Sequence, residues 1–230
     1  MYEIDHEPIR RKTWIRVANL PQARVGWELS DCTDVPQPDL EKVSKWLSGL
    51  YRGIVVEATG KDTCGLGLLL YGLPGRGKTA LAATILQEIM RNASLEALKV
   101  REGKTIVRPC HFISFSALLD LKGATMGDDI DEQSQSVYDG IFCSHPDDAY
   151  NVRVLVLDDV GREHASLSGW QKSVLHHLLR TRYNNGYPTI VTTNIMRDEW
   201  EALYGTATAS FVDEAFVPLF MDYKSDLRKL

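Results

Sequence analysis

The chain has 230 residues and a formal net charge of −5, from 26 basic and 31 acidic residues. This length suits one domain, or one domain with a short appendage. A hydrophobic fraction of 44% and a charged fraction of 25% are ordinary for a globular protein. No apolar run approaches the roughly 20 residues that a bilayer span needs. The composition therefore excludes a disordered chain, a membrane-spanning protein and a protein that coats DNA through a general excess of cations.

The N-terminal residues are polar, and the sequence predicts a mobile arm there, followed by the main domain. Met1–Lys12 lacks the apolar run of a secretory signal, so we expect a cytoplasmic protein without membrane association. Residues 1–18 are interpreted as the arm, either a short partner-binding element or a tail without a partner. Residues 19–230 are interpreted as one domain. Trp14–Asp34, which spans the boundary between the two, is expected to form extended structure and turns.

Hydrophobic periodicity predicts helices that alternate with strands over the rest of the chain. Spacings of three and four indicate helices, and short apolar or β-branched runs indicate buried strands. The expected helices are Leu40–Leu50, Thr79–Arg91, Ala117–Lys122, Trp170–Tyr183 and Glu199–Tyr204. The expected strands are Leu66–Tyr71, Val107–Phe115, Val152–Leu157, Thr189–Thr193 and Phe216–Met221. This alternation predicts an α/β fold, with a mostly parallel sheet covered by helices on both faces.

Acidic residues are concentrated in one part of the chain. Between Asp120 and Asp159 there are ten acidic and two basic residues, so the remainder carries a slight excess of base. Within this part, Gly123–Ser136 is polar and nearly without large apolar residues, which predicts a flexible loop. The slightly basic remainder leaves room for a localised contact with single-stranded DNA.

Residues Gly72 to Thr79 satisfy the pattern G-x-x-x-x-G-K-T, between an expected buried strand and an expected helix. Glycines let the backbone wrap a polyphosphate, and the helix N-terminus favours anions. Lys78 is placed to reach the β- and γ-phosphates, and the Thr79 hydroxyl to ligate Mg²⁺. The expected nucleotide-binding residues of this loop are Gly72, Pro74, Gly75, Arg76, Gly77, Lys78, Thr79 and Ala80.

Polar residues also end two later strands. Asp158 and Asp159 follow a fully apolar run, and Asn194 follows a β-branched one. The carboxyl end of a buried parallel strand opens on the ligand side of the sheet. We therefore expect Asp158 to bind Mg²⁺, directly or through water, together with Thr79. Asp159 is expected to orient the attacking water, and Asn194 to bond the γ-phosphate or that water. The expected catalytic residues are Lys78, Asp159 and Asn194.

These segments together resemble the AAA+ ATPases of the DnaC and IstB type, from about Leu20 to the C-terminus. Gly72–Thr79 is similar to the Walker A motif of that family, and Val154–Asp159 to its Walker B motif. Arg182–Asn194 is similar to the family segment R-Y-x-x-G-x-P-T-I-x-T-[ST]-N, in which Asn194 is sensor 1. The resemblance implies a P-loop NTPase of AAA+ type without a C-terminal helical lid domain. It also implies that ATP and Mg²⁺ are bound and that ATP is hydrolysed.

Two segments near the C-terminus bear on the resemblance. Asp222–Arg228 is similar to the closing segment of the family, in which Arg228 is a sensor-2-like arginine that touches the nucleotide; the alternative is a solvated terminal side chain. The family usually has an arginine finger in a T-A-S-R-L segment, but here Phe211 stands at that position. Either Arg197 or Arg162 replaces the finger, or hydrolysis by a self-assembled ring is weak.

The resemblance implies a helicase loader, which helps to place a replicative DnaB-type hexameric helicase on single-stranded DNA and can assemble into an ATP-dependent oligomer. An IstB-like transposition helper is the alternative within the family, and it would favour a substantial basic surface. An ATP-gated adaptor with weak hydrolysis agrees with Phe211. A small-molecule kinase shares the phosphate loop, but the strand before Asn194 fits an ATPase better.

Overall fold

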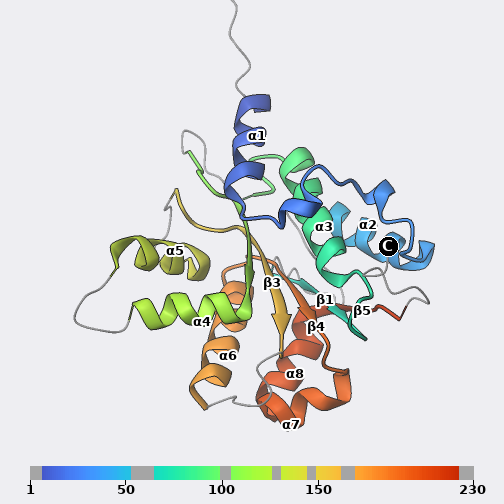
Figure 1. The fold of residues 1–230 in the computed structure, drawn as a ribbon, viewed down its shortest axis with the longest axis vertical. Helices are drawn as coiled ribbons and strands as arrows, with labels where there is room; N and C mark the ends of the chain where they lie inside the picture. The colour runs from blue at the N-terminus through green and yellow to red at the C-terminus, as the bar shows by residue number, and fades with distance from the viewer. Residues whose placement is uncertain are drawn as a thin grey trace, which may run out of the picture.

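A sheet of parallel strands forms the centre of the fold in the computed structural model (Figure 1). The structure describes residues 7–52, 65–98, 105–125, 131–143, 149–161 and 169–222. Within these ranges the strands are β1 (Gly67–Tyr71), β2 (Cys110–Ser114), β3 (Val154–Val160), β4 (Thr189–Thr193) and β5 (Phe216–Phe220). Their order is β2-β3-β4-β1-β5, and every pair is parallel. The predicted α/β fold with a parallel sheet is confirmed.

One face of the sheet is covered by the first three helices, α1 (Glu7–Val17), α2 (Gln37–Tyr51) and α3 (Lys78–Asn92). Alternate strand residues such as Leu68 and Leu70 point to this face, because side chains of a strand alternate between its two sides. Helix α3 lies directly against the sheet and is buried along most of its length. The α2 residue Trp46 is buried and donates from its indole nitrogen to the carbonyl of Leu66 at 2.9 Å.

The other face is covered by α4 (Phe115–Ala124), α5 (Glu132–Phe142), α6 (Gly169–Asn184), α7 (Trp200–Tyr204) and α8 (Thr206–Ala215). Figure 1 shows these helices opposite α2 and α3, with the sheet between the two layers. In the described ranges β5 is the last element. No helix in them is long and apolar enough to cross a membrane.

Arg182 of α6, the first residue of the segment Arg182–Asn194, has a structural role. Its side chain is fully buried and donates to the carbonyl oxygens of Ile141 (2.6 Å) and Val152 (2.9 Å), and to the Thr189 hydroxyl (3.0 Å). A buried guanidinium is tolerated only when its donors are satisfied in this way. Arg182 therefore joins α6 to the end of α5 and to the starts of β3 and β4.

The N-terminal part differs from its prediction. Residues from Glu7 onward form helix α1 and not a polar arm, and the extended structure expected from Trp14 begins only after Val17. Trp14 is 1% exposed and donates from its indole nitrogen to the carbonyl of Ile106 at 3.2 Å. The helix was missed because it buries few side chains, so it shows no apolar stripe of helical period.

The segment after α1, residues 18–35, runs along α3, and we call it the strap. It contains the short 3₁₀ turns Gln22–Arg24 and Leu29–Asp31. The buried amide of Gln87 on α3 accepts from the backbone N–H of Gly26 and donates to the carbonyl of Arg24, both at 2.8 Å. The strap is thus held to α3 through its backbone.

Two further helices were not predicted. The loop expected over Gly123–Ser136 is wrong at both ends, because α4 continues to Ala124 and α5 begins at Glu132. The Asp131 carboxylate starts α5 by accepting from the backbone N–H groups of Gln133 and Ser134. Helix α8 was missed as well. The other expected helices and strands are confirmed, with bounds that shift by a few residues.

Candidate nucleotide-binding site

The phosphate loop joins the end of β1 to the start of α3. Gly75 and Gly77 have φ values of 79° and 78°, a region that residues with a side chain rarely adopt. Gly77 is also the residue that precedes α3, so the loop delivers the chain directly to the helix N-terminus. At Gly72 an added Cβ would lie 2.5 Å from the carbonyl oxygen of Met221. The sequence spacing of glycines therefore corresponds to backbone positions that need them.

Lys78 lies inside this loop. Its side chain is only 7% exposed, and its ammonium donates to the carbonyl oxygens of Gly72 at 2.8 Å and Leu73 at 2.7 Å. These contacts fold the ammonium over the loop. Carbonyl oxygens hold a cation less strongly than phosphate oxygens do, so the contacts are exchangeable for an anionic ligand.

The Asp158 carboxylate lies at the carboxyl end of β3, where two hydroxyl groups reach it. Thr79 donates to its Oδ1 atom at 3.0 Å, and Thr192 of β4 donates to the same atom at 2.6 Å. Burial raises the pKa of Asp158, and the charge of Asp159 adds to this rise, while the hydrogen bonds from Thr192 and Thr79 lower the pKa. Hard oxygen donors of this kind suit Mg²⁺. Thr79 and Asp158 therefore fit the predicted metal site, because their oxygens meet at one place.

Asp159 occupies an irregular point of the same strand. The pairing of β3 with β4 shifts register between Leu157 and Val160, and Asp159 has a φ of 60°, which is uncommon outside glycine. Its backbone N–H donates to the Thr192 hydroxyl at 2.9 Å. The irregular backbone directs Asp159 to the cavity, which a regular strand would not do for two successive residues.

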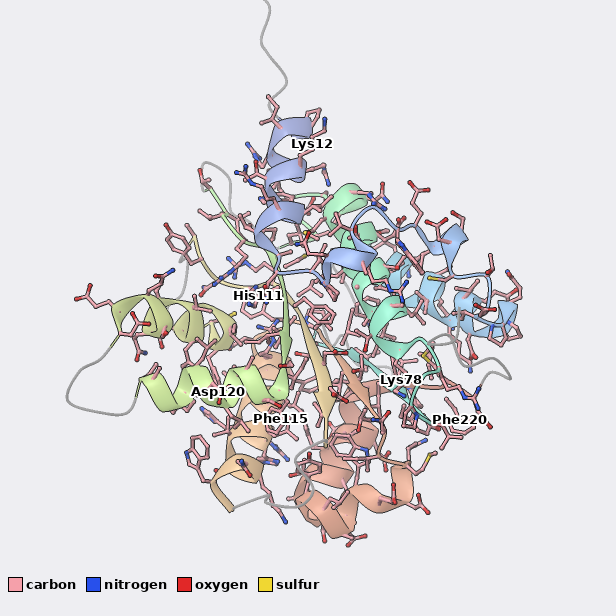
Figure 2. The ribbon with its side chains drawn as sticks, in the orientation of Figure 1. Lys12, Lys78, His111, Phe115, Asp120 and Phe220 are labelled. Atoms are coloured by element: carbon pink, nitrogen blue, oxygen red, sulfur yellow. The ribbon has the colours of Figure 1, made fainter. Side chains whose placement is uncertain are left out.

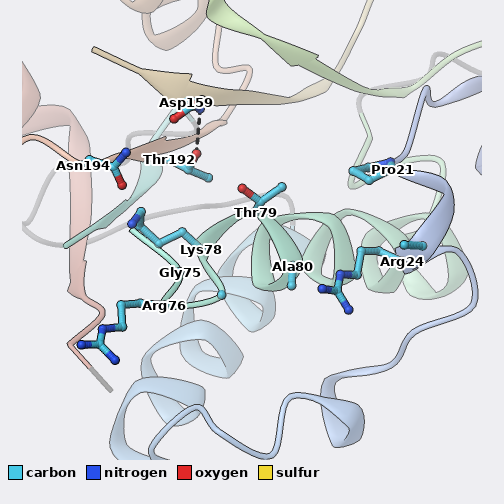
Figure 3. Close-up of a pocket in the computed structure, with 12 residues that line it drawn as sticks. Pro21, Arg24, Gly75, Arg76, Lys78, Thr79, Ala80, Asp159, Thr192 and Asn194 are labelled. Atoms are coloured by element: carbon cyan, nitrogen blue, oxygen red, sulfur yellow. Dashed lines mark hydrogen bonds between the residues drawn. The ribbon is translucent and has the colours of Figure 1, made fainter. Parts of the chain in front are cut away.

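These side chains border one cavity of about 230 Å³ (Figure 3). Figure 3 shows Lys78, Thr79, Asp159 and Asn194 around a common space, and Pro21 and Arg24 at the far end of it. The lining residues are Pro21, Ala23, Arg24, Gly75, Arg76, Gly77, Lys78, Thr79, Ala80, Asp159, Thr192 and Asn194. The structure thus brings together loop residues 75–80, Asp159 and Asn194, which are among the site residues expected from the sequence. Gly72 and Pro74 lie in the turn before them.

Sequence reasoning missed the residues that the strap contributes. Pro21, Ala23 and Arg24 line the cavity, and Arg24 also lines an adjoining cavity of about 380 Å³ between the strap and α3. There the Arg24 guanidinium stands 4.2 Å from the centre of the Trp27 ring, a cation–π contact. No local motif marks these residues. Thr192 was missed too, although it lies in the same polar strand end as Asn194.

Of the four arginines assigned from the sequence to the nucleotide or to the finger, the structure describes two, and one of these lines the cavity. Arg76 lines the cavity, with its Nε atom 3.9 Å from the Asp222 carboxylate. Arg197 does not line it and pairs with Asp213 of α8. Arg162 and Arg228 lie outside the described residues. Phe211 is 4% exposed, so the residue at the expected finger position packs in the core.

The solved structures that are similar to this chain include those of DnaI, of a primosome component and of DnaA. That of DnaI has 19% identity and a TM-score of 0.58, over 89% of this chain and 95% of that one. A candidate primosome component from Streptococcus pyogenes serotype M3 has 21% identity and a TM-score of 0.54, over 90% and 91%. The replication initiator DnaA bound to AMPPCP and single-stranded DNA has 14% identity and a TM-score of 0.52, over 84% and 48%. No family model and no curated protein matches the chain.

The chain has the AAA+ fold. The chain places its phosphate loop after β1, beside the carboxyl ends of β3 and β4, where the strand order changes direction. Open α/β sheets bind ligands at such a switch point. The resemblance drawn from the Walker-like segments is therefore confirmed at the level of the fold.

Proposed function

We propose that this AAA+ chain is an ATP-hydrolysing replication protein of the helicase-loader type. The observation that carries the ATPase part is the convergence of Lys78, Thr79, Asp159 and Asn194 on one cavity, beside Asp158. Replication as the setting is supported by the similar folds of DnaI, the Streptococcus pyogenes protein and DnaA. We infer a cytoplasmic location from that setting.

Each side chain has a part in the reaction. The backbone N–H groups of the loop and the start of α3 bind the phosphates, and Lys78 exchanges its carbonyl partners for phosphate oxygens. Thr79 and Asp158 hold Mg²⁺, which when bound neutralises charge on the β- and γ-phosphates. Asp159 orients the attacking water, and Asn194 bonds the γ-phosphate or that water. Arg228 completes the site as a sensor-2-like arginine.

The partner that we propose is a replicative DnaB-type helicase, placed on single-stranded DNA by an ATP-dependent oligomer of this chain. In such an oligomer Arg197 or Arg162 acts as the arginine finger in trans. A buried Phe211 favours a second candidate, an ATP-gated adaptor in which ATP changes partner affinity and turnover is weak. An IstB-like transposition helper is the third, with a transposase as partner.

Replacing Asp159 with Asn tests the hydrolytic part, because it keeps the shape of the side chain and removes its charge. We expect ATP to bind with unchanged affinity and turnover to fall about 100-fold or more, since an amide orients water for in-line attack poorly. Single-turnover hydrolysis and nucleotide titration measure the two quantities separately. Wild-type turnover in this variant would reject the role of Asp159.

Co-elution tests the partner. The protein with ATP and Mg²⁺ is mixed with the replicative helicase of its own host and, separately, with a transposase, and each mixture is run on size exclusion. We expect a complex with the helicase that requires ATP. A complex with the transposase alone would favour the transposition helper. The adaptor would be favoured by two results together. The Asp159→Asn variant would bind the helicase in the presence of ATP, and the wild-type protein would hydrolyse ATP much more slowly than the complex forms and dissociates.

A further inference from the structure

A large cavity that is open to solvent lies on the opposite side of the sheet from α3, at the edge strand β2. It measures about 630 Å³ and is bordered by the end of α1, by β2, by α4 and by α5. Figure 2 labels His111 on β2 and Asp120 on α4, at two sides of this region. It shares no lining residue with the two cavities beside the phosphate loop. Its volume is in the range of small-molecule sites, roughly 300–1,000 Å³.

His111 lines this cavity and lacks a hydrogen-bond partner at one ring nitrogen. The side chain is 5% exposed, and its Nδ1 atom is buried without a partner among the described residues. Burial lowers the pKa of His111 to about 3, and the charges of Arg108 and Arg182 add to this effect. The imidazole is therefore neutral at neutral pH. The great majority of buried polar side-chain atoms have a partner. His111 lines the cavity, so a ligand bound there could supply the partner that this nitrogen lacks.

Arg108 lines the same cavity, and its situation is similar. Its guanidinium is partly buried, and its Nε atom is buried without a hydrogen-bond partner among the described residues. Burial lowers the pKa of Arg108, which means that the protein leaves this cation poorly solvated. Both unpartnered nitrogens therefore belong to residues that line one cavity.

The chemistry of the lining selects the kind of ligand. Arginine can only donate hydrogen bonds, and a neutral histidine donates from one ring nitrogen and accepts at the other. Acceptor atoms on the ligand are therefore required by Arg108 and can also be bound by His111, in the tautomer that carries its proton on the nitrogen facing them. A poorly solvated cation further favours a negative charge. The remaining wall is largely apolar, with Ile113, Leu121 and Val137 from three elements. An inorganic ion would leave this apolar wall uncovered.

We propose that the cavity binds a small organic anion, whose carboxylate or phosphate group accepts hydrogen bonds from Arg108 and His111 and whose apolar part covers Ile113, Leu121 and Val137. This site is independent of the proposed ATPase function. Asp120 is the acidic residue among those that line the cavity, and it is exposed on α4. Water screens its charge there, so it does not cancel the field of the more buried Arg108.

The experiment follows the side-chain N–H of Arg108 and the ring nitrogens of His111 by ¹⁵N NMR, in the full chain with saturating ADP to occupy the phosphate loop. The probes are benzoate, phenyl phosphate and benzyl alcohol, which share an apolar ring and differ in the head group. We expect saturable shifts at both residues with one or both anions. The anion that binds with the higher affinity shows whether the site prefers a carboxylate or a phosphate. Benzyl alcohol is expected to bind at least about tenfold more weakly than that anion.

Two variants complete the test. Arg108→Gln is expected to weaken the anion about tenfold or more, with ATP affinity and thermal stability close to wild type. Lys12→Gln removes an exposed cation of α1 outside the cavity and is expected to bind the anion as the wild type does. Equal affinity in Arg108→Gln and wild type, or no saturable shift with either anion, overturns the proposal. Displacement of phenyl phosphate by a short single-stranded oligonucleotide also overturns it, since the occupant would then be a nucleic acid.

Discussion

The two ends of helix α3 are held by residues of different kinds. At its N-terminal end lie the phosphate loop and the strand ends that carry Asp158 and Thr192. At its C-terminal end, the guanidinium of Arg11 on α1 donates to three backbone carbonyl oxygens, those of Met90 (3.0 Å), Arg91 (2.8 Å) and Ala93 (3.0 Å). Both arrangements match the helix dipole, which favours anions at the N-terminus and cations at the C-terminus.

The difference lies in how each end is encoded. The N-terminal end needs glycines and a lysine within eight consecutive residues, so its chemistry is visible as a motif. The C-terminal end depends on one arginine that is 79 to 82 positions away in the chain. The strap joins the two, because it leads from α1 along α3 to the nucleotide cavity. Variants near the N-terminal end of α3 should therefore affect mainly ATP binding and turnover, and variants near its C-terminal end should affect mainly the free energy of unfolding.

Lys78→Ala at the N-terminal end is expected to have the largest effect. ATP affinity should fall about 100-fold, because the ammonium that neutralises phosphate charge is lost. The free energy of unfolding without nucleotide should change much less, since the ammonium donates to carbonyl oxygens of the exposed loop. Titration with a fluorescent ATP analogue and thermal unfolding measure the two. Unchanged ATP affinity would show that the cavity is not the nucleotide site.

Thr192→Val comes next, and it tests the hydroxyl that joins Asp158 to the backbone of Asp159. The substitution keeps the shape and removes both hydrogen bonds. We expect kcat to fall about 10- to 100-fold as the two carboxylates lose their alignment, with ATP affinity within about threefold of wild type. Thr192→Ser keeps the hydroxyl and should recover most of kcat. Equal losses in both variants would point to packing as the cause.

The same contrast explains how much the sequence could predict. Strands, most helices and the residues Lys78, Thr79, Asp158, Asp159 and Asn194 were predicted, because buried strands have short apolar runs and their polar ends mark the ligand side of a parallel sheet. Helix α1 was not predicted, and the strap was predicted only as extended structure and turns, since both are held by long-range contacts to α3 and to Ile106 and not by a periodic apolar face. Hydrophobic periodicity within a short stretch of sequence does not predict contacts between distant parts of the chain.

Gln87→Met tests the middle of α3, where the strap is attached. The variant fills the same space but leaves the N–H of Gly26 without its acceptor and removes one of the two donors to the Arg24 carbonyl, the other being the Trp27 N–H. This should lower the free energy of unfolding by about 2 kcal/mol. ATP affinity should fall by about threefold to tenfold, because Arg24 is no longer held at the cavity. Denaturant unfolding and nucleotide titration provide the readouts. Asn92→Ala, at an exposed position of the same helix, is the matched control and should leave ATP affinity unchanged.

Arg11→Met at the C-terminal end is expected to have the smallest effect and to leave ATP affinity unchanged. The methionine still covers the apolar surface near Trp14, over whose ring the guanidinium lies at 5.8 Å, but the last carbonyls of α3 lose their donor. We expect the free energy of unfolding to fall by about 1–2 kcal/mol, less so at high salt, because the lost contacts are charge-assisted. Hydrogen exchange should increase in the last turn of α3 and in α1 before it increases elsewhere. A drop in ATP affinity as large as that of Gln87→Met would mean that the two ends of α3 are coupled, and that α1 senses the nucleotide through the helix itself.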